Sequence, residues 1–290
     1  MDYAGAATLV AGLAPLLMAL SLGSHELAWT SPLLLGLLAF SVAMLLAFVR
    51  IERGVPKPIL PLALVRSRGV GIPTVGMLFL SGLFATSLFT PLFVQGVIGS
   101  SATRSGSVVA PMMLAFVAGS VMIGQLIARV PRYRVVGVLG LIAAAIGEWL
   151  MSSMGVDADY ATVARNRVVV GFGLGTALSA FAIASQNSVD VAQMGVATGL
   201  GTSGRAIGAT LGSAGFGSLL VARIGADTVS APVLAGALHD TFFAAVLVLL
   251  IGAVLVLPLA GLAGLVVVLG VLIVVETRRY AALRAGARPS

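Results

Sequence analysis

Long apolar runs, separated by short polar or basic segments, dominate the pattern of this 290-residue chain. Each run is long enough for an α-helix to cross a bilayer core of about 30 Å, which takes roughly 20 residues. The pattern predicts an all-α polytopic integral membrane bundle of about eight transmembrane helices. The predicted spans are residues 4–22, 31–49, 70–99, 105–128, 135–154, 168–189, 191–222 and 241–275.

Two of these runs are longer than one simple span. Residues 70–99 contain Pro73 and Pro91, which predict one long, kinked helix. Residues 241–275 hold 35 uncharged residues, a helix of about 50 Å at ~1.5 Å per residue. One overlong helix bent near Pro258 and two short spans broken near Pro258 are the alternatives.

The distribution of basic residues favours eight spans. With the N-terminus in the cytoplasm, 12 basic residues lie in the inside segments and four outside, as the positive-inside rule requires. The outside four are Arg104, Arg165, Arg167 and Arg223. Eight spans place both termini in the cytoplasm, which predicts a multi-pass protein of a bacterial inner membrane.

The segment from residue 50 to 68 differs from the rest, since it holds three prolines and five basic residues. It predicts a cytoplasmic loop with a short interfacial helix over 61–65. The expected organisation is therefore two transmembrane helices (1–50), a basic loop (51–71), a six-helix bundle (72–275) and a basic tail (276–290).

The composition narrows the classes of function. The chain is 59% hydrophobic and 9% charged, whereas soluble proteins have about 25% charged residues. Its net charge of +7 comes from basic clusters between apolar runs, so nucleic acid is not an expected partner; the lipid bilayer is. No cysteine is present, and the distance between His25 and His239 gives no metal-binding spacing. Nothing resembles a catalytic triad, so neither an enzyme nor a cofactor is predicted.

A glycine-rich stretch, residues 195–217, contains eight glycines and one charge, Arg205. Gly204, Gly208 and Gly212 recur every fourth residue, which places them on one helical face and allows another backbone to approach closely. The spacing of Gly171, Gly173 and Gly175 likewise predicts helix packing, because a nucleotide-binding loop would follow a strand.

Three polar residues are candidates for a proton-coupling or substrate cavity: Glu148, Arg205 and Gln95. A buried carboxylate can exchange a proton, and a guanidinium at membrane depth should face protein or a wet cavity. The alternatives are a Glu148 solvated near the outer interface and an Arg205 that binds backbone carbonyls. For Gln95, Gln186 and Asn187, hydrogen bonds between helices or solvation at the membrane interface are favoured over substrate contact. The Met and Phe residues of the third and fourth spans are packing residues or the soft wall of a promiscuous pocket.

Six motifs in a fixed order carry a family resemblance: DYAGAATL, LSLG…WTSP, PILPLALVRSR, TPLFVQGVIGSSATRSG, GFGLG and QNSV…GVATG…RAIGATLG. Together they resemble the fourteen-span drug:proton antiporters of the major facilitator superfamily (the EmrB/QacA type). The resemblance implies that residues 4–49 are the two extra helices between the halves of such a transporter. It also implies that 72–154 and 168–275 are the inverted three-helix repeats of the C-terminal half.

The resemblance implies the C-terminal portion of a proton-coupled multidrug exporter for lipophilic, often cationic compounds, driven by the proton gradient. The family's N-terminal half is absent, so transport is expected to need that half as a partner or a homodimer. One alternative is a non-transporting membrane module that pairs through its glycine-rich helix. Another is an exporter of amino acids or secondary metabolites.

Overall fold

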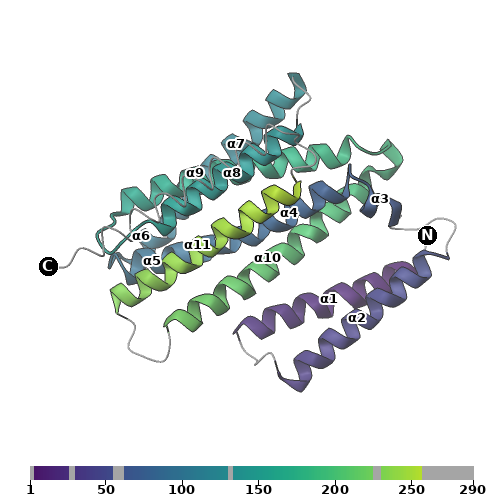
Figure 1. Ribbon diagram of the computed structural model, residues 1–290, viewed down its shortest axis with the longest axis horizontal. Helices are drawn as coiled ribbons and strands as arrows, with labels where there is room; N and C mark the ends of the chain where they lie inside the picture. Colours follow the sequence, from purple (N-terminus) through teal and green to yellow (C-terminus); the bar gives the residue numbers. More distant parts are fainter. Residues whose placement is uncertain (1–2, 26–29, 55–61, 130–132, 225–229, 257–290) are drawn as a thin grey trace.

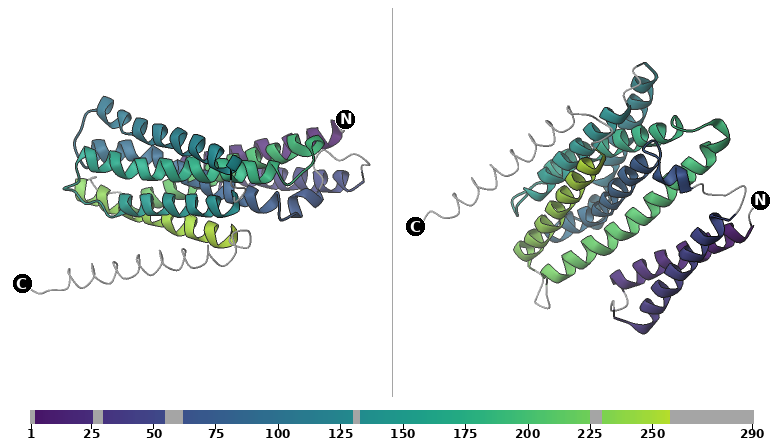
Figure 2. Two further views of the ribbon diagram at one scale, coloured as in Figure 1. Left: turned by 90° about the horizontal axis from the view of Figure 1, so that it is seen from above. Right: turned by 45° about the vertical axis from the view of Figure 1, so that its right-hand side comes forward.

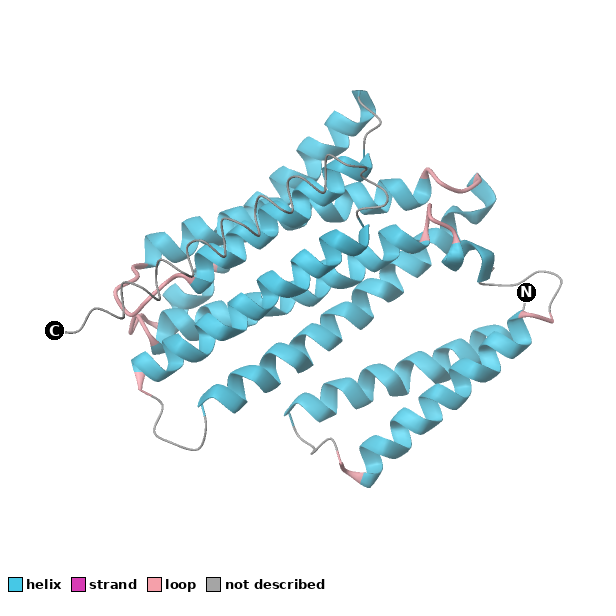
Figure 3. Ribbon diagram, in the orientation of Figure 1, coloured by secondary structure: helices cyan, strands magenta, loops and turns pink. Residues whose placement is uncertain are grey.

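A computed structural model describes residues 3–25, 30–54, 62–129, 133–224 and 230–256, and these residues form helices and connecting loops without a strand (Figure 1, Figure 3). The all-α fold class is therefore confirmed. Seven of the described helical stretches are long and apolar enough to cross a membrane, which makes the chain a multi-pass membrane protein. The predicted tail 276–290 lies outside the described residues.

The first two helices form a hairpin beside the rest of the bundle. Helix α1 (Tyr3–His25) packs against α2 (Pro32–Glu52), where the Ser41 hydroxyl donates a 2.6 Å hydrogen bond to the carbonyl of Gly12. Helix α1 also contacts α10 (Met194–Ile224), so the hairpin lies alongside the bundle at its α10 side (Figure 1). Both predicted spans of this region are helical.

A short helix and a long, interrupted helical span lie where the interfacial helix and the kinked span are predicted. Helix α3 (Leu62–Arg66) precedes a rod made of α4 (Gly71–Phe84), η1 (Ala85–Phe89) and α5 (Thr90–Gly96). Pro73 lies in the first turn of α4, where no backbone N–H is needed. Pro91 lies just after the tighter 3₁₀ turn η1, because it has no N–H to continue the α-helical ladder.

The remaining chain forms the bulk of the bundle. Its elements are α6 (Ala102–Ser107), α7 (Val109–Arg129), α8 (Tyr133–Ser152), α9 (Tyr160–Gln186), η2 (Val191–Gln193), α10 and α11 (Ala231–Val256). The predicted fourth span is thus two helices, and the fifth and seventh lie close to their predicted positions.

Two predicted boundaries are wrong. Helix α9 begins at Tyr160 and not at residue 168, because Asp159 caps it: its carboxylate accepts a 2.9 Å hydrogen bond from the backbone N–H of Thr162. Helix α11 begins at Ala231 and not at residue 241, and it includes Asp240. Polar residues near a membrane surface did not end either helix. Residues 257–275, the second half of the predicted last span, lie outside the described residues.

Helices α4 and α9 occupy equivalent positions in the bundle. Helix α4 packs against α10 and α11, and α9 packs against α7 and α8. The first helix of each predicted triplet therefore contacts the second and third helices of the other triplet, as two swapped three-helix repeats would require. Helix α7 lies on one side of this arrangement, and α8 and α11 lie on the other (Figure 2, left).

Candidate functional site

The glycines of α10 bring this helix against α4. A Cβ atom on Gly208 would overlap the backbone carbonyl of Leu78, and one on Gly212 would overlap the backbone of Gly82. A Cβ on Gly204 would lie 3.0 Å from the Thr74 methyl group. Backbone-to-backbone packing of this kind requires small residues. The neighbouring face of α10, which carries Arg205, does not take part in this backbone contact with α4 and lines the adjoining hollow.

The glycines of α9 work in the same way, but they face two different helices. A Cβ on Gly171 or Gly175 would overlap the carbonyls of Met112 and Phe116 on α7. A Cβ on Gly173 would overlap the backbone of Ala144 on α8. Alternate glycines thus hold α9 between α7 and α8, which fixes the position of the α9 side chains that lie between these contacts.

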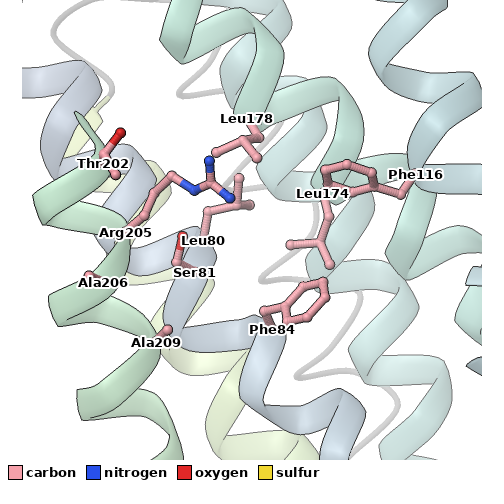
Figure 4. A pocket seen from close by; sticks show the side chains of 10 residues that line it. All are labelled: Leu80, Ser81, Phe84, Phe116, Leu174, Leu178, Thr202, Arg205, Ala206 and Ala209. Carbon is pink, nitrogen blue, oxygen red and sulfur yellow. The ribbon is translucent and has the colours of Figure 1, made fainter. Parts of the chain in front are cut away.

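A groove lies between α4, α7, α9 and α10. Its central hollow has a volume of about 380 Å³ and is mainly apolar, with one charged residue, Arg205, and two hydroxyls (Figure 4). The lining residues are Leu80, Ser81, Phe84, Phe116, Leu174, Leu178, Thr202, Arg205, Ala206 and Ala209.

Two further hollows extend the groove along α10. One of about 90 Å³ shares Leu178, Thr202 and Arg205 with the central hollow and reaches Gln186. The other, of about 440 Å³, shares Phe84 and Ala209 and reaches Leu17 of α1. No carboxylate lines any of these three hollows. The groove is therefore a long apolar track whose single charge is positive.

Arg205 extends from α10 across the central hollow, where its guanidinium lies near Leu80 and Leu178 (Figure 4). Within the described ranges it takes part in neither of the two ion pairs, which are Arg167–Glu148 and Arg223–Asp240. The residue is exposed in the open groove. A guanidinium always carries its charge, so Arg205 presents a positive charge to the groove that no carboxylate of the described residues neutralises.

A second polar centre lies in the interior, where α8, α9, α11 and η1 meet. Arg167 on α9 donates a 2.7 Å hydrogen bond from Nη1 to Oε1 of Glu148 on α8. Both side chains are buried, at 1% and 0% exposure. Thr86 in η1 completes the cluster, because its hydroxyl donates to the same Glu148 oxygen at 2.7 Å and its carbonyl accepts from Arg167 Nη2 at 3.0 Å. Three helical segments are joined at this point.

The pair is closed in by an aromatic ring. The guanidinium carbon of Arg167 lies 5.2 Å from the centroid of the Phe242 ring on α11, a cation–π distance. Two atoms of the pair, Glu148 Oε2 and Arg167 Nε, have no hydrogen-bond partner among the described residues. The cluster is therefore held by short hydrogen bonds at Glu148 Oε1 and the Arg167 Nη atoms, whereas the hydrogen-bonding capacity of Glu148 Oε2 and Arg167 Nε is unused among the described residues.

Comparison with known proteins places the chain in a family. The profile of the Major Facilitator Superfamily matches residues 3–213. The chain belongs to this superfamily. It is 31% identical over 225 residues to multidrug transporter protein MdtP of Bacillus subtilis, with 77% of this chain and 41% of the relative covered. It is 32% identical over 220 residues to multidrug resistance protein 3 of the same organism, with 76% of this chain and 43% of the relative covered.

A third relative is a tetracycline resistance determinant of Streptomyces rimosus, which is 33% identical over 224 residues, with 77% of this chain and 64% of the relative covered. The chain thus spans less than half the length of the two Bacillus relatives that it matches. These relatives confirm the resemblance to the drug antiporter type of the superfamily.

The structure does not bring the three predicted cavity residues of this facilitator chain together. Arg205 lines the groove, and Glu148 lies in the buried pair. Gln95 is exposed near the end of α5, where its amide donates a 2.7 Å hydrogen bond to the Ser105 hydroxyl. Gln186 donates to Thr198 at 3.3 Å and lines the smallest hollow, and Asn187 is exposed.

Sequence reasoning missed Arg167. It was assigned to an outer loop, and this is wrong, because the residue is fully buried within α9. A signal was present: Arg167, Val170 and Leu174 have the three- and four-residue spacing of one helical face. Because Arg167 lies on the same helical face as the core residue Leu174, its side chain is expected to point into the bundle. A buried guanidinium in turn requires an acidic partner.

Proposed function

We propose that this chain is part of a proton-driven facilitator that exports lipophilic compounds across the cell membrane. The observation that carries the proposal is the groove: an apolar track along α4 and α10, with one central charge. Apolar walls with few polar groups suit ligands that are recognised by shape and hydrophobicity. The names of the relatives, which include two multidrug proteins, support the same activity.

A second helical bundle is proposed to close the groove. In the most apolar stretch of α10, 28% of the residues are buried, against 61% in α9. Facilitators move their substrate between two bundles that rock about a site near the membrane centre. The two Bacillus relatives are more than twice as long as the segment that they share with this chain, which fits an N-terminal bundle as the partner. The bundle is proposed to lie in a bacterial inner membrane with both termini in the cytoplasm.

The other proposed partner, a second copy of the chain, would have to use a different surface from the one predicted. The glycine face of α10 packs against α4 within the same chain, so a partner that used this face would have to displace α4. The surface open to a partner consists of the groove and the exposed residues of α10 and α7 along its edges.

Glu148 is proposed to carry the coupling proton. A proton on this carboxylate would cancel its attraction to Arg167 and leave the Thr86 contacts as the remaining link. Thr86 lies two residues beyond Phe84, a groove residue, and within the 3₁₀ segment that already interrupts the helix. Release of the pair would therefore loosen the α4–η1–α5 rod at its 3₁₀ segment, next to the end of the groove. The proton gradient supplies the energy, and no cofactor is needed.

The test is dye export from pump-deficient bacteria. The chain is expressed alone and together with the N-terminal six-helix bundle of a relative, and the accumulation of a neutral dye and of ethidium is measured. Co-expression is expected to lower the accumulation of at least one of the two dyes, a protonophore to abolish the effect, and Glu148→Gln to reduce it. Asp240→Asn, which alters an exposed ion pair with Arg223, is the control and should export like the wild type.

Three outcomes would overturn the proposal in whole or in part. Unchanged accumulation of both dyes in co-expressing cells that contain the folded complex contradicts export. Export that survives the protonophore contradicts proton coupling. Full activity of Glu148→Gln removes this residue from the coupling step.

A further inference from the structure

The groove contains a charge that the cationic substrates implied by the family resemblance do not explain. Arg205 stands in the central hollow, and no acidic residue lines this hollow or the two that adjoin it. A cationic substrate would meet a like charge in a poorly screened apolar setting, which disfavours it. The single positive charge of this groove therefore favours an anionic ligand over a cationic one.

We propose that the groove binds amphiphilic organic anions, with the acidic head group on Arg205 and the apolar body along α4 and α10. This inference rests on the proposed export function and specifies its substrate class. The planar guanidinium offers donors that match a carboxylate or sulfonate, and it does so with two parallel hydrogen bonds. Ser81 and Thr202 add hydroxyls to the wall of the same hollow.

The geometry gives the apolar body of the ligand a direction. From Arg205 the groove continues past Phe84 and Ala209 into the hollow of about 440 Å³, whose walls include Leu88 and, from α1, Leu17. In the opposite direction it narrows to the hollow of about 90 Å³ beside Gln186. A flat or chain-like apolar group therefore fits towards Leu17, and a polar head fits at Arg205.

The three other arginines of the described α9, α10 and α11 helices do not compete for such an anion. Arg167 is buried against Glu148, and Arg223 lies at the end of α10 in an exposed pair with Asp240, 2.9 Å away. Arg165 takes part in neither ion pair, but it lies at the exposed start of α9 and lines none of the three hollows. Arg205 is therefore the arginine of these helices that is both outside an ion pair and in the groove.

The test uses two probes that share an apolar body and differ in charge. Anilinonaphthalene sulfonate carries a sulfonate, and phenylnaphthylamine is its neutral counterpart. Each is titrated against the full chain in nanodiscs of zwitterionic lipid, with empty nanodiscs as the background. Arg205→Gln is expected to weaken sulfonate binding about tenfold, the effect of losing a charged hydrogen bond, and to leave the neutral probe within about twofold.

Two variants keep the test falsifiable. Arg205→Lys retains the charge but not the two parallel donors, so its sulfonate affinity should lie between those of the wild type and Arg205→Gln. Arg223→Gln removes an arginine from the same helix outside the groove and should leave both probes unchanged. Equal weakening of both probes by Arg205→Gln would assign the residue a packing role and overturn the proposal, as would sulfonate binding that is insensitive to Arg205→Gln.

The same variant separates this inference from the export function. If the co-expressed chain exports a neutral dye but Arg205→Gln leaves the export of an anionic dye unchanged, the anion site is wrong and export stands. If no dye is exported while the sulfonate binds through Arg205, the anion site stands and the proposed export is wrong.

Discussion

Two arginines on consecutive helices of this facilitator show two ways of placing a charge inside a membrane protein. Arg167 is enclosed by α8, α11 and η1 and is neutralised by Glu148 at 2.7 Å. Arg205 lies in an open apolar groove beside hydroxyls and without an acidic neighbour in the described hollows. The first charge serves the protein itself, since it joins three helical segments. The second is available to a ligand.

Removing one partner of the buried pair should give the largest effect on stability. Glu148→Met leaves a buried guanidinium that stays charged at any working pH, and it is expected to lower the free energy of unfolding by about 3–5 kcal/mol. Arg167→Met should cost less, because a carboxylate left alone can bind a proton. Arg205→Met removes an exposed charge and should change stability by no more than about 0.5 kcal/mol. Thermal unfolding in detergent measures all three.

A double variant sharpens this contrast. Glu148→Met with Arg167→Met replaces the whole pair by apolar side chains and should recover most of the stability that either single change loses. If Arg205→Met destabilises the chain as much as Glu148→Met does, the distinction between a structural and a ligand-facing arginine is wrong. A double variant that is no more stable than Glu148→Met would show that the cluster depends on its shape more than on its charges.

The two faces of α10 give the next largest effect. Gly208→Ala puts a methyl group into the backbone of Leu78 and should destabilise the chain by roughly 1–3 kcal/mol, since the two helices must separate. Gly215→Ala, on the same helix, has no atom within 4 Å of the new methyl group and is the matched control. It should be neutral or slightly stabilising, because alanine favours helix more than glycine does.

Groove binding provides a second measurement for these glycine variants. Gly208→Ala should weaken both the sulfonate and the neutral probe, because it moves the helix that carries Arg205, whereas Gly215→Ala should leave both unchanged. Equal stability of the two variants would show that α10 does not need its close contact with α4.

The sequence was informative where a local pattern was sufficient. The four-residue spacing of Gly204, Gly208 and Gly212 indicates a packing face, and Pro91 indicates the interruption of a span, because each depends on its own helix alone. Glu148 and Arg205 stand out as charges in apolar runs. All of these features can be read without knowing which helices are neighbours.

The sequence was uninformative where a contact joins distant segments. Thr86, Glu148 and Arg167 come from three parts of the chain, and nothing local marks them as a cluster. The polar residues that precede Arg167 have the composition of a loop, so the start of α9 was placed eight residues late. For the same reason Glu148 and Arg205 were expected to share one cavity, and their separation follows only from helix packing.

The smallest expected effect concerns the cap of the helix that carries Arg167. Hydrogen bonds from Thr162 hold the pKa of the exposed Asp159 carboxyl below its ordinary value. Because the folded pKa is lowered, the cap stabilises the protein above the ordinary aspartate pKa, and this contribution is lost as the pH falls through the folded value. Asp159→Ala should therefore lower the unfolding temperature slightly at neutral pH, and the difference should vanish on acidification.

Asp159→Asn provides the control for this prediction, since its side-chain oxygen can still accept from Thr162 but does not titrate. It should remain close to the wild type at neutral pH and show less dependence on acid. Arg167 lies eight residues beyond the cap and is held by Glu148, Thr86 and Phe242 from other segments. If Asp159→Ala were as damaging as Glu148→Met, the position of Arg167 would depend on the end of its own helix, and the buried pair would not be what fixes it.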